Sequence, residues 1–190
     1  YSGLVVWSFF SGAVASSSGS LVQSANLITK VYFPRLIVPI AAVGARLVDL
    51  AIAAVILVGM ALFYGVPIGL SLFMIPVLIV LVATLALGAG IWTSAINVKY
   101  RDVAVVMPVA LQLWMYASPV IYPITLIPEN WRWLYSLNPM VGVVENFRAA
   151  LLGLPFDWAA LAFSTATAAL LLVGAVYAFR RVEKSFADII

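Results

Sequence analysis

Residues 70–96 read LSLFMIPVLIVLVATLALGAGIWTSAI and contain no charged side chain. The hydrocarbon core of a bilayer is about 30 Å thick, and a helix needs about 20 mostly apolar residues to cross it. Lipid offers no hydrogen-bonding partner to a free backbone amide, so such a stretch must close its hydrogen bonds within itself. The sequence therefore predicts a transmembrane α-helix over residues 70–96.

The composition of the whole chain agrees with a protein that lies mostly in lipid. Hydrophobic residues make up 65% and charged residues 9% of the 190 positions, and the mean hydropathy is +1.15. Soluble domains carry about a quarter charged residues. The sequence contains no cysteine and no histidine. This excludes disulfides, thiol nucleophiles, and imidazole ligands or bases.

Four further apolar stretches satisfy the same length requirement, at residues 3–22, 36–64, 103–121 and 158–179. The alternation expected of barrel strands is absent. The predicted fold is an all-α, polytopic transmembrane bundle with five spans, and residues 1–190 form a single transmembrane domain. The chain begins at Tyr1 and runs directly into apolar sequence. We therefore expect a missing N-terminal portion with one more span, which gives six in the full protein.

The basic residues predict how the spans are oriented. Every second connection is basic: Lys30 and Arg35 in the first, Lys99 and Arg101 in the third, and the tail after the last span. Basic connections face the cytoplasm. Residues 23–35 and 180–190 are thus predicted to be cytoplasmic, and residues 122–157 to lie on the opposite side.

Residues 122–157 are too apolar for an ordinary loop and contain four prolines. Trp131 and Trp133 are typical of a membrane interface. Asn138 is a candidate N-cap for a short helix that ends near Gly153. We expect two short re-entrant helices here, surrounded by protein or by a water-filled cavity.

Residues 26–39, NLITKVYFPRLIVP, combine basic and aromatic side chains in a short turn. One interpretation is positive-inside anchoring with interfacial aromatics. The other is a docking segment, in which Tyr32 and Phe33 fill a partner's groove while Lys30 and Arg35 pair with its acidic residues.

An ordered set of motifs resembles a known family. These are ANLITKVYFPRLIVPI at residues 25–40, NVKYRDV at 97–103, SPVIYPITLIP at 118–128 with LNPM at 137–140, and FRRVEKSFADII at 179–190. The chain resembles the permease subunits of type-2 ABC exporters, most closely those that move O-antigen, capsular or teichoic-acid polysaccharides. The resemblance implies a coupling region at residues 23–35 and outer gate helices at 124–137 and 138–152.

The resemblance also implies roles for individual residues. Coupling to the ATPase falls to Lys30, Val31, Tyr32, Phe33, Pro34 and Arg35. The second cytoplasmic connection contains Asn97, Lys99, Tyr100, Arg101 and Asp102. The outer gate contains Pro128, Glu129, Trp131, Arg132, Asn138, Pro139, Glu145 and Arg148. Candidate aromatic linings of the sugar path are Trp7, Phe9, Phe10, Trp114, Tyr116 and Tyr122, each with packing or interfacial anchoring as the alternative.

Arg46 and Asp49 stand three residues apart within a predicted span, and Glu145 and Arg148 do so on the second predicted re-entrant helix. Residues at this spacing share a helix face and can form ion pairs. We interpret both as structural pairs, while a role in opening the gate stays open for the second.

The resemblance implies a transporter subunit and not an enzyme. The sequence also contains no GxxxxGK[ST] motif, so nucleotide binding would require a separate subunit. No cofactor is expected in this chain, because ATP and Mg²⁺ would bind a separate ATPase subunit. Expected partners are that ATPase, a second permease copy, membrane lipid and a lipid-linked polysaccharide, without nucleic acid. The expected location is the bacterial cytoplasmic (inner) membrane, as a multi-pass protein.

Three alternatives remain. A drug or another lipid could be the cargo of the same framework. A lipid-sugar transferase would need clustered acids, whereas those present are scattered and form no DxD or HExxH motif. A secondary transporter would need ion sites and internal repeats, which the sequence does not display.

Overall fold

The computed structural model describes residues 1–30, 33–66 and 69–183, and within these ranges every regular element is helical. The elements are α1 (Ser2–Gln23), α2 (Ala25–Lys30), α3 (Ile37–Phe63), η1 (Leu70–Met74), α4 (Ile75–Lys99), α5 (Val103–Tyr116), η2 (Ile124–Leu126), α6 (Glu129–Ser136), α7 (Pro139–Leu152) and α8 (Trp158–Val182). The predicted all-helical class is confirmed.

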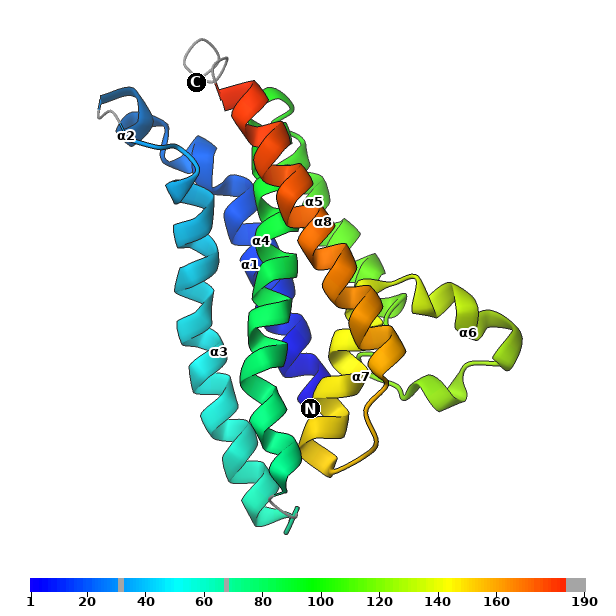
Figure 1. Cartoon of the computed structure of the whole chain (residues 1–190). Helices are drawn as coiled ribbons and strands as arrows, with labels where there is room; N and C mark the ends of the chain where they lie inside the picture. The colour runs from blue at the N-terminus through cyan, green and yellow to red at the C-terminus, as the bar shows by residue number, and fades with distance from the viewer. Residues whose placement is uncertain (31–32, 67–68, 184–190) are drawn as a thin grey trace.

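Four helical segments in the described part of the chain are long and apolar enough to cross a membrane: α1, α3, η1 with α4, and α8. Figure 1 shows these helices side by side, with α2 and the end of α8 at the top and the α3–α4 connection at the bottom. Their positions match four of the stretches that hydropathy singled out. The protein is therefore a multi-pass membrane protein.

The stretch expected to span residues 103–121 is shorter than predicted. Helix α5 has 14 residues and ends at Tyr116, which corresponds to a length of about 21 Å. Ser118 precedes Pro119, a position that disfavours helical backbone, and Pro119 has no N–H to donate. The backbone therefore turns here although the sequence stays apolar to Ile121.

Helix α1 lies at the centre of the bundle. In its most apolar window 61% of the residues are buried, against 11% in α3. It packs against α3, α4, α5 and α7, while α4 also packs against α8. Helix α3 buries Val43, Leu50 and Leu57, which recur every seventh residue along one stripe. Most of its other large apolar side chains are exposed, as expected for a helix that faces lipid.

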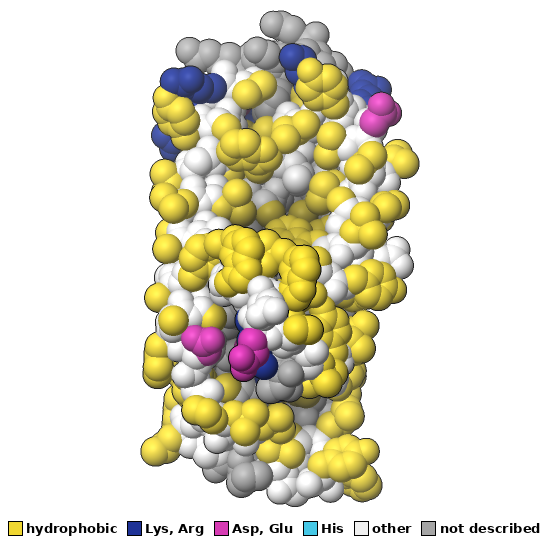
Figure 2. Space-filling view, turned by 90° about the vertical axis from the view of Figure 1, so that its right-hand side faces the viewer, with side chains coloured by type: hydrophobic (Ala, Val, Ile, Leu, Met, Phe, Trp, Pro, Cys, Tyr) yellow, Lys and Arg dark blue, Asp and Glu magenta, His cyan; other side chains and the backbone are white. Residues whose placement is uncertain are grey.

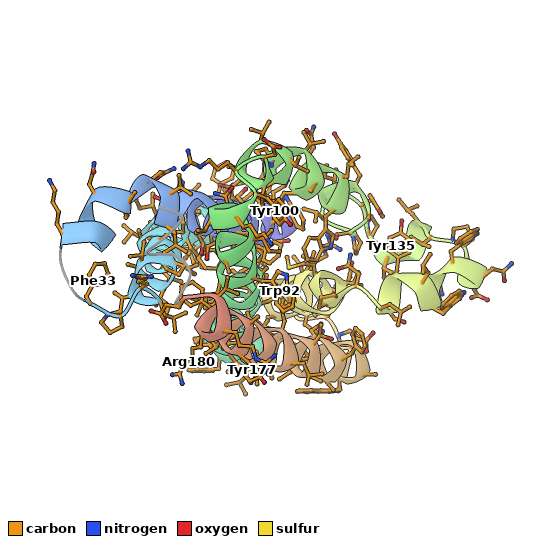
Figure 3. All side chains as sticks on the ribbon, turned by 90° about the horizontal axis from the view of Figure 1, so that it is seen from above. Phe33, Trp92, Tyr100, Tyr135, Tyr177 and Arg180 are labelled. Carbon is orange, nitrogen blue, oxygen red and sulfur yellow. The ribbon has the colours of Figure 1, made fainter. Side chains whose placement is uncertain are left out.

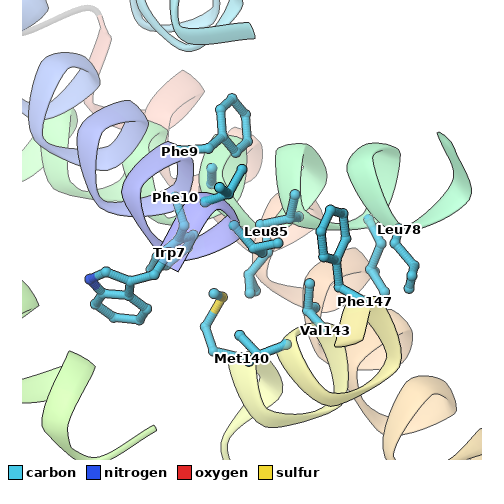
Figure 4. Close-up of a cluster of buried hydrophobic side chains, with 14 of the residues drawn as sticks. Trp7, Phe9, Phe10, Leu78, Leu85, Met140, Val143 and Phe147 are labelled. Carbon is cyan, nitrogen blue, oxygen red and sulfur yellow. The ribbon is translucent and has the colours of Figure 1, made fainter. Parts of the chain in front are cut away.

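Two apolar clusters hold the helices together. The larger contains Trp7 and Phe10 of α1, Leu85 of α4, and Met140 and Phe147 of α7, as Figure 4 shows. The smaller lies near the end of the bundle that carries α2. It is formed by Leu21, Ile91, Ala95, Val98, Ala175 and Phe179 of α1, α4 and α8.

Glycines permit close approaches of helices, and Gly88 and Gly142 are two examples. A Cβ atom added to Gly88 of α4 would lie 2.9 Å from the backbone nitrogen of Leu172 in α8. A Cβ atom at Gly142 of α7 would collide with the carbonyl oxygen of Ala160 and with the Ser164 side chain. Small residues permit this tight packing of α8 against α4 and α7.

Residues 122–157 form two unlike helices. Asn138 caps α7, since its side chain accepts a hydrogen bond from the Met140 N–H at 3.1 Å, and Gly153 ends it with a φ of 67°. The N-cap and the C-terminal glycine predicted from the sequence are thus confirmed. Helix α7 packs into the bundle, whereas α6 buries no residue and projects sideways, as Figures 1 and 3 show.

Candidate functional site

The basic residues gather at one end of the bundle. Figure 2 shows Lys and Arg side chains near the top, where α2 and the end of α8 lie, and mostly hydrophobic side chains below. We call this the basic end; in the described part of the chain it contains Lys30, Arg35, Lys99, Arg101, Arg180 and Arg181. A helical bundle with one basic end has the charge distribution of a multi-pass membrane protein whose basic end faces the cytoplasm.

Part of the predicted coupling segment lies at this end. Val31 and Tyr32 are outside the described residues, and Lys30 is exposed at the end of α2. Phe33 is half-buried and packs, with Leu36 and Val38, against the smaller apolar cluster. These three side chains therefore seat the segment on the ends of α1, α4 and α8.

Arg35 contacts α8 directly. Its guanidinium donates a hydrogen bond to the Glu183 carbonyl oxygen at 2.5 Å, and its backbone N–H donates to the Glu183 carboxylate at 3.3 Å. One interpretation of the sequence pairs Arg35 with acidic residues of a partner, and this stays a prediction. In the structure the Arg35 guanidinium contacts Glu183 within the chain, a residue that the sequence motifs did not single out.

The second connection is organised by Asn97. Its side chain is buried, donates to the Ser18 carbonyl oxygen at 3.0 Å and accepts from the Ala104 N–H at 3.1 Å. Asn97 thereby joins α1 to the start of α5. The neighbouring predicted residues are exposed and free to face a partner surface: Lys99, Tyr100, Arg101 and Asp102.

The six aromatic residues predicted for the sugar path lie in different environments. Trp7, Phe9 and Phe10 are buried, at most 4% exposed. The Phe10 and Trp114 rings meet edge to face at 5.2 Å between centroids. Trp7 and Phe10 pack among other side chains, whereas Phe9 borders a concave space of about 190 Å³ that is also lined by Arg46 and Asp49. Trp114 and Tyr122 are half-buried, and Tyr116 is exposed. A path-lining role stays a prediction for all six residues.

The predicted gate residues are partly brought together by Asn138. Its side chain accepts from the Trp114 indole N–H at 3.0 Å and donates to the Ser118 hydroxyl at 2.8 Å. Asn138 thus ties the end of α5 to the start of α7. A concave space of about 460 Å³ lies beside it, lined by Trp114, Ala117, Leu134, Tyr135, Leu137, Asn138 and Pro139.

Arg148 adds a second tie between the same parts. It forms an ion pair with Glu145 at 2.6 Å and donates to the Pro119 carbonyl oxygen at 3.2 Å. On α6, Arg132 pairs with Glu129 at 3.5 Å in an exposed position. Pro128 precedes α6, and Trp131 is exposed on it. The gate residues therefore form a bonded group around α7 and a separate exposed group on α6.

Tyr122 and Tyr135 close the base of the segment that carries α6. Their hydroxyl oxygens are 3.2 Å apart, and the Tyr122 hydroxyl also donates to the Tyr116 carbonyl oxygen at 2.9 Å. Burial and then the hydrogen bond to Tyr135 raise the pKa of Tyr122 to about 12. Its hydroxyl consequently remains protonated at neutral pH and keeps its proton for donation.

A polar groove between α1 and α3 contains the other predicted ion pair. Arg46 and Asp49 are 3.0 Å apart, and Arg46 also donates to the Ser16 hydroxyl at 2.9 Å. The pair predicted from spacing is confirmed. The groove has a volume of about 810 Å³ and runs from this pair past Gln23 to Phe33. It joins polar groups at membrane depth to the coupling segment. Across residues 1–30, 33–66 and 69–183 no cluster of three acidic side chains could hold a metal ion.

The described residues thus form an all-helical, multi-pass membrane bundle with one basic end. The chain is a member of the ABC-2 type transporter family, whose model matches residues 2–152.

Three relatives each align with half of the chain or more. An "O-antigen export system permease protein RfbA" of Klebsiella pneumoniae is 23% identical over 189 residues, which cover 99% of this chain and 73% of that protein. The protein of the same name from Myxococcus xanthus is 30% identical over 149 residues, 77% of this chain and 57% of its own length. The "Inner membrane transport permease YadH" of Escherichia coli K12 is 31% identical over 108 residues, 51% of this chain and 42% of its own.

Proposed function

We propose that this chain forms the membrane-spanning part of an ATP-driven exporter that moves a lipid-linked polysaccharide across the bacterial cytoplasmic membrane. The observation that carries the proposal is the alignment of 99% of the chain with a protein named as an O-antigen export permease. That match extends across the coupling segment, the second connection and the α6–α7 region. The YadH match is consistent with the same family but names no cargo, so it does not favour the drug or lipid alternative.

In this proposal the basic end faces the cytoplasm, and its part formed by α2 and the α4–α5 connection docks on a separate ATPase. Exposed Lys30, Lys99 and Arg101 supply positive charge there, and Phe33 supplies an aromatic side chain. ATP and Mg²⁺ bind the ATPase, and this chain needs no cofactor of its own. The chain performs no bond-making or bond-breaking step.

A second copy of the chain completes the path for the polymer. The apolar faces of α3 and α5 that remain exposed include Val48, Val55 and Val105, and they fit lipid or a second copy. Trp114, Tyr116 and Tyr122 supply aromatic faces near the α6–α7 region. Aromatic faces hold the CH surfaces of sugars with few fixed hydrogen bonds, which suits a polymer that slides.

The export step is tested by complementation. The full-length protein is expressed with its cognate ATPase in a strain whose own O-antigen export permease is deleted, and surface O-antigen is measured with an antibody. We expect surface polymer to return, and to be lost when the ATPase Walker Lys is replaced. Accumulation of polymer only inside the cell, with both proteins present in the membrane, would contradict the proposed cargo.

Orientation is tested separately. The sequence has no cysteine, so single cysteines can be introduced without a background. Arg101→Cys should react with a membrane-impermeant maleimide only in broken cells, whereas Tyr64→Cys, at the opposite end of α3, should react in intact cells. The reverse pattern would overturn the docking side and with it the proposed coupling.

A further inference from the structure

The contact between Arg35 and Glu183 joins two parts of the chain that are 148 residues apart in sequence. It is a reciprocal contact: the Arg35 guanidinium reaches the backbone carbonyl of Glu183, and the Glu183 carboxylate reaches the backbone N–H of Arg35. Both groups are partly buried. We call this pair of hydrogen bonds the Arg35–Glu183 clasp.

The Arg35 guanidinium lies at a helix end that favours a cation. Glu183 follows the last residue of α8, where carbonyl groups carry partial negative charge, so a guanidinium is stabilising there. The clasp therefore fixes the segment before α3 to the end of α8 by electrostatic attraction as well as by hydrogen bonds.

Apolar packing supports the clasp on both sides. Phe33 and Leu36 from the coupling segment, and Val182 from α8, pack on the same smaller cluster. Phe179 and Ala175 of α8 belong to that cluster and are fully buried. Because the coupling segment packs directly against α8, we expect a displacement of this segment to displace α8 as well.

The opposite end of α8 is fixed to α7. The Ser164 hydroxyl donates to the Pro139 carbonyl oxygen at 2.7 Å, and the Asn146 side chain donates to the Asp157 carbonyl oxygen at 3.1 Å. The Asp157 N–H donates back to the Asn146 side chain at 3.0 Å. Helix α8 has 25 residues, so it spans about 37 Å between the clasp and these bonds.

We infer that Arg35 is a positioning residue for transport: the Arg35–Glu183 clasp passes movement of the coupling segment to α8, and α8 passes it to α7. The inference rests on the proposed function, since it needs an ATPase that moves the coupling segment. Movement of the coupling segment can pass directly into α3, which follows it in sequence. The inference adds a second route, through the clasp and α8, to α7. It also assigns Arg35 a partner inside the chain in place of one on the ATPase.

The experiment uses the full-length permease with its ATPase in proteoliposomes, where ATP hydrolysis and polymer export are measured together. Arg35→Met removes the guanidinium and keeps the aliphatic length. We expect it to keep ATPase binding and hydrolysis but to lower export per ATP by about fivefold, the scale of a single coupling contact. Arg35→Lys keeps a cation near the end of α8 and should retain most of the polymer export per ATP. Glu183→Ala removes only the longer bond to the Arg35 N–H and keeps the carbonyl that the guanidinium contacts, so it should lower export per ATP by less than Arg35→Met.

The matched control is Arg181→Met. Arg181 is a basic residue at the same end, two positions before Glu183, and its hydrogen bond and ring contact are both with Tyr177 of its own helix. It should leave export per ATP unchanged. An equal loss in Arg181→Met and Arg35→Met would mean that positive charge alone matters, and would overturn the clasp.

A covalent replacement separates coupling from folding. In the cysteine-free background, Arg35→Cys with Glu183→Cys should lose export per ATP, and a short bifunctional thiol reagent should restore it. Unchanged export in Arg35→Met, or no recovery after efficient cross-linking, would overturn the inference while leaving the proposed function intact. If instead the wild-type permease neither binds the ATPase nor exports with ATP, the proposed function itself fails.

Discussion

Helices α6 and α7 follow each other in sequence and carry the same pair of charges, yet the pairs lie in opposite environments. Glu129 and Arg132 on α6, and Glu145 and Arg148 on α7, both stand three residues apart. The α6 pair is 3.5 Å apart, and its side chains are 44% exposed for Arg132 and 86% for Glu129. The α7 pair is 2.6 Å apart, with 17% and 20% exposed. The spacing of the residues therefore predicts that an ion pair forms, but burial decides how much the pair contributes to the free energy of unfolding.

The difference extends to the whole of each helix. Helix α6 buries none of its residues, whereas α7 buries ten, among them Val143, Asn146 and Phe147. In α7 the backbone approaches α8 so closely that only glycine fits at position 142. We infer that α7 belongs to the folded bundle and that α6 is an attached element. Substitutions matched between the two helices test this.

The largest effect is expected at Gly142. Gly142→Leu would place side-chain atoms against the Ala160 carbonyl, which cannot rotate away, and would displace the Ser164 hydroxyl from the Pro139 carbonyl. Overpacking typically costs up to about 3 kcal/mol, and a lost hydrogen bond about 1 kcal/mol more. We expect the free energy of unfolding to fall by about 4 kcal/mol, seen as a lower thermal midpoint of the full-length protein in detergent. Gly44→Leu, where a Cβ has open space, should change the midpoint little.

Asn146 should give the next largest effect. Asn146→Leu removes a fully buried amide and leaves the Asp157 N–H and carbonyl without that partner. The Asn146 side chain makes three hydrogen bonds, two with Asp157 and one with the Gly142 carbonyl oxygen; at about 1 kcal/mol each, we expect a loss of about 3 kcal/mol. The same substitution at Asn130, exposed on α6, should stay within about 0.5 kcal/mol. Equal thermal midpoints for the two variants would contradict the division between the helices.

How much of this the sequence could predict depends on whether a signal is local. Asn138 before Pro139, and Gly153 after the last turn, define α7 by local chemistry, so both of its ends were predictable. The end of α5 was not, because hydropathy continues past Tyr116 while the backbone turns at Pro119. Hydropathy measures whether a side chain avoids water, and it does not predict where the backbone leaves the helical conformation.

Tertiary contacts had no such signal. Aromatic residues on an apolar helix can face protein, lipid or a path, and nothing in the sequence separates Phe10, fully buried, from Tyr116, 57% exposed. Arg35 and Glu183 meet only because three helices bring their ends together. Glu183 lies in a tail that reads as a simple basic terminus, so the sequence pointed to the arginine and missed its partner.

The two ion pairs give the most direct test of the comparison. Arg148→Met leaves the Glu145 carboxylate largely buried without its partner and removes the bond to Pro119. We expect a loss of about 2 kcal/mol, between the values for exposed and fully buried pairs. Arg132→Met on α6 should lose at most about 0.5 kcal/mol. Glu145→Gln combined with Arg148→Met should recover part of the loss, because no unpaired charge remains; a double variant worse than Arg148→Met would argue that Glu145 has another partner.

The smallest effect is expected for the aromatic side chains of α6. Trp131 and Trp133 are 58% and 64% exposed, so replacing both by Ala should move the thermal midpoint in detergent by less than about 1 °C. Tryptophan is typical of the membrane interface, and we therefore expect these two side chains to contact lipid. In liposomes with brominated lipid, the double variant should lose a large part of the quenchable tryptophan fluorescence, whereas Trp7→Phe, buried beside Phe10, should lose little. A thermal loss as large as that of Arg148→Met would instead mean that α6 packs against protein in the full assembly, and the contrast with α7 would then belong to the single chain only.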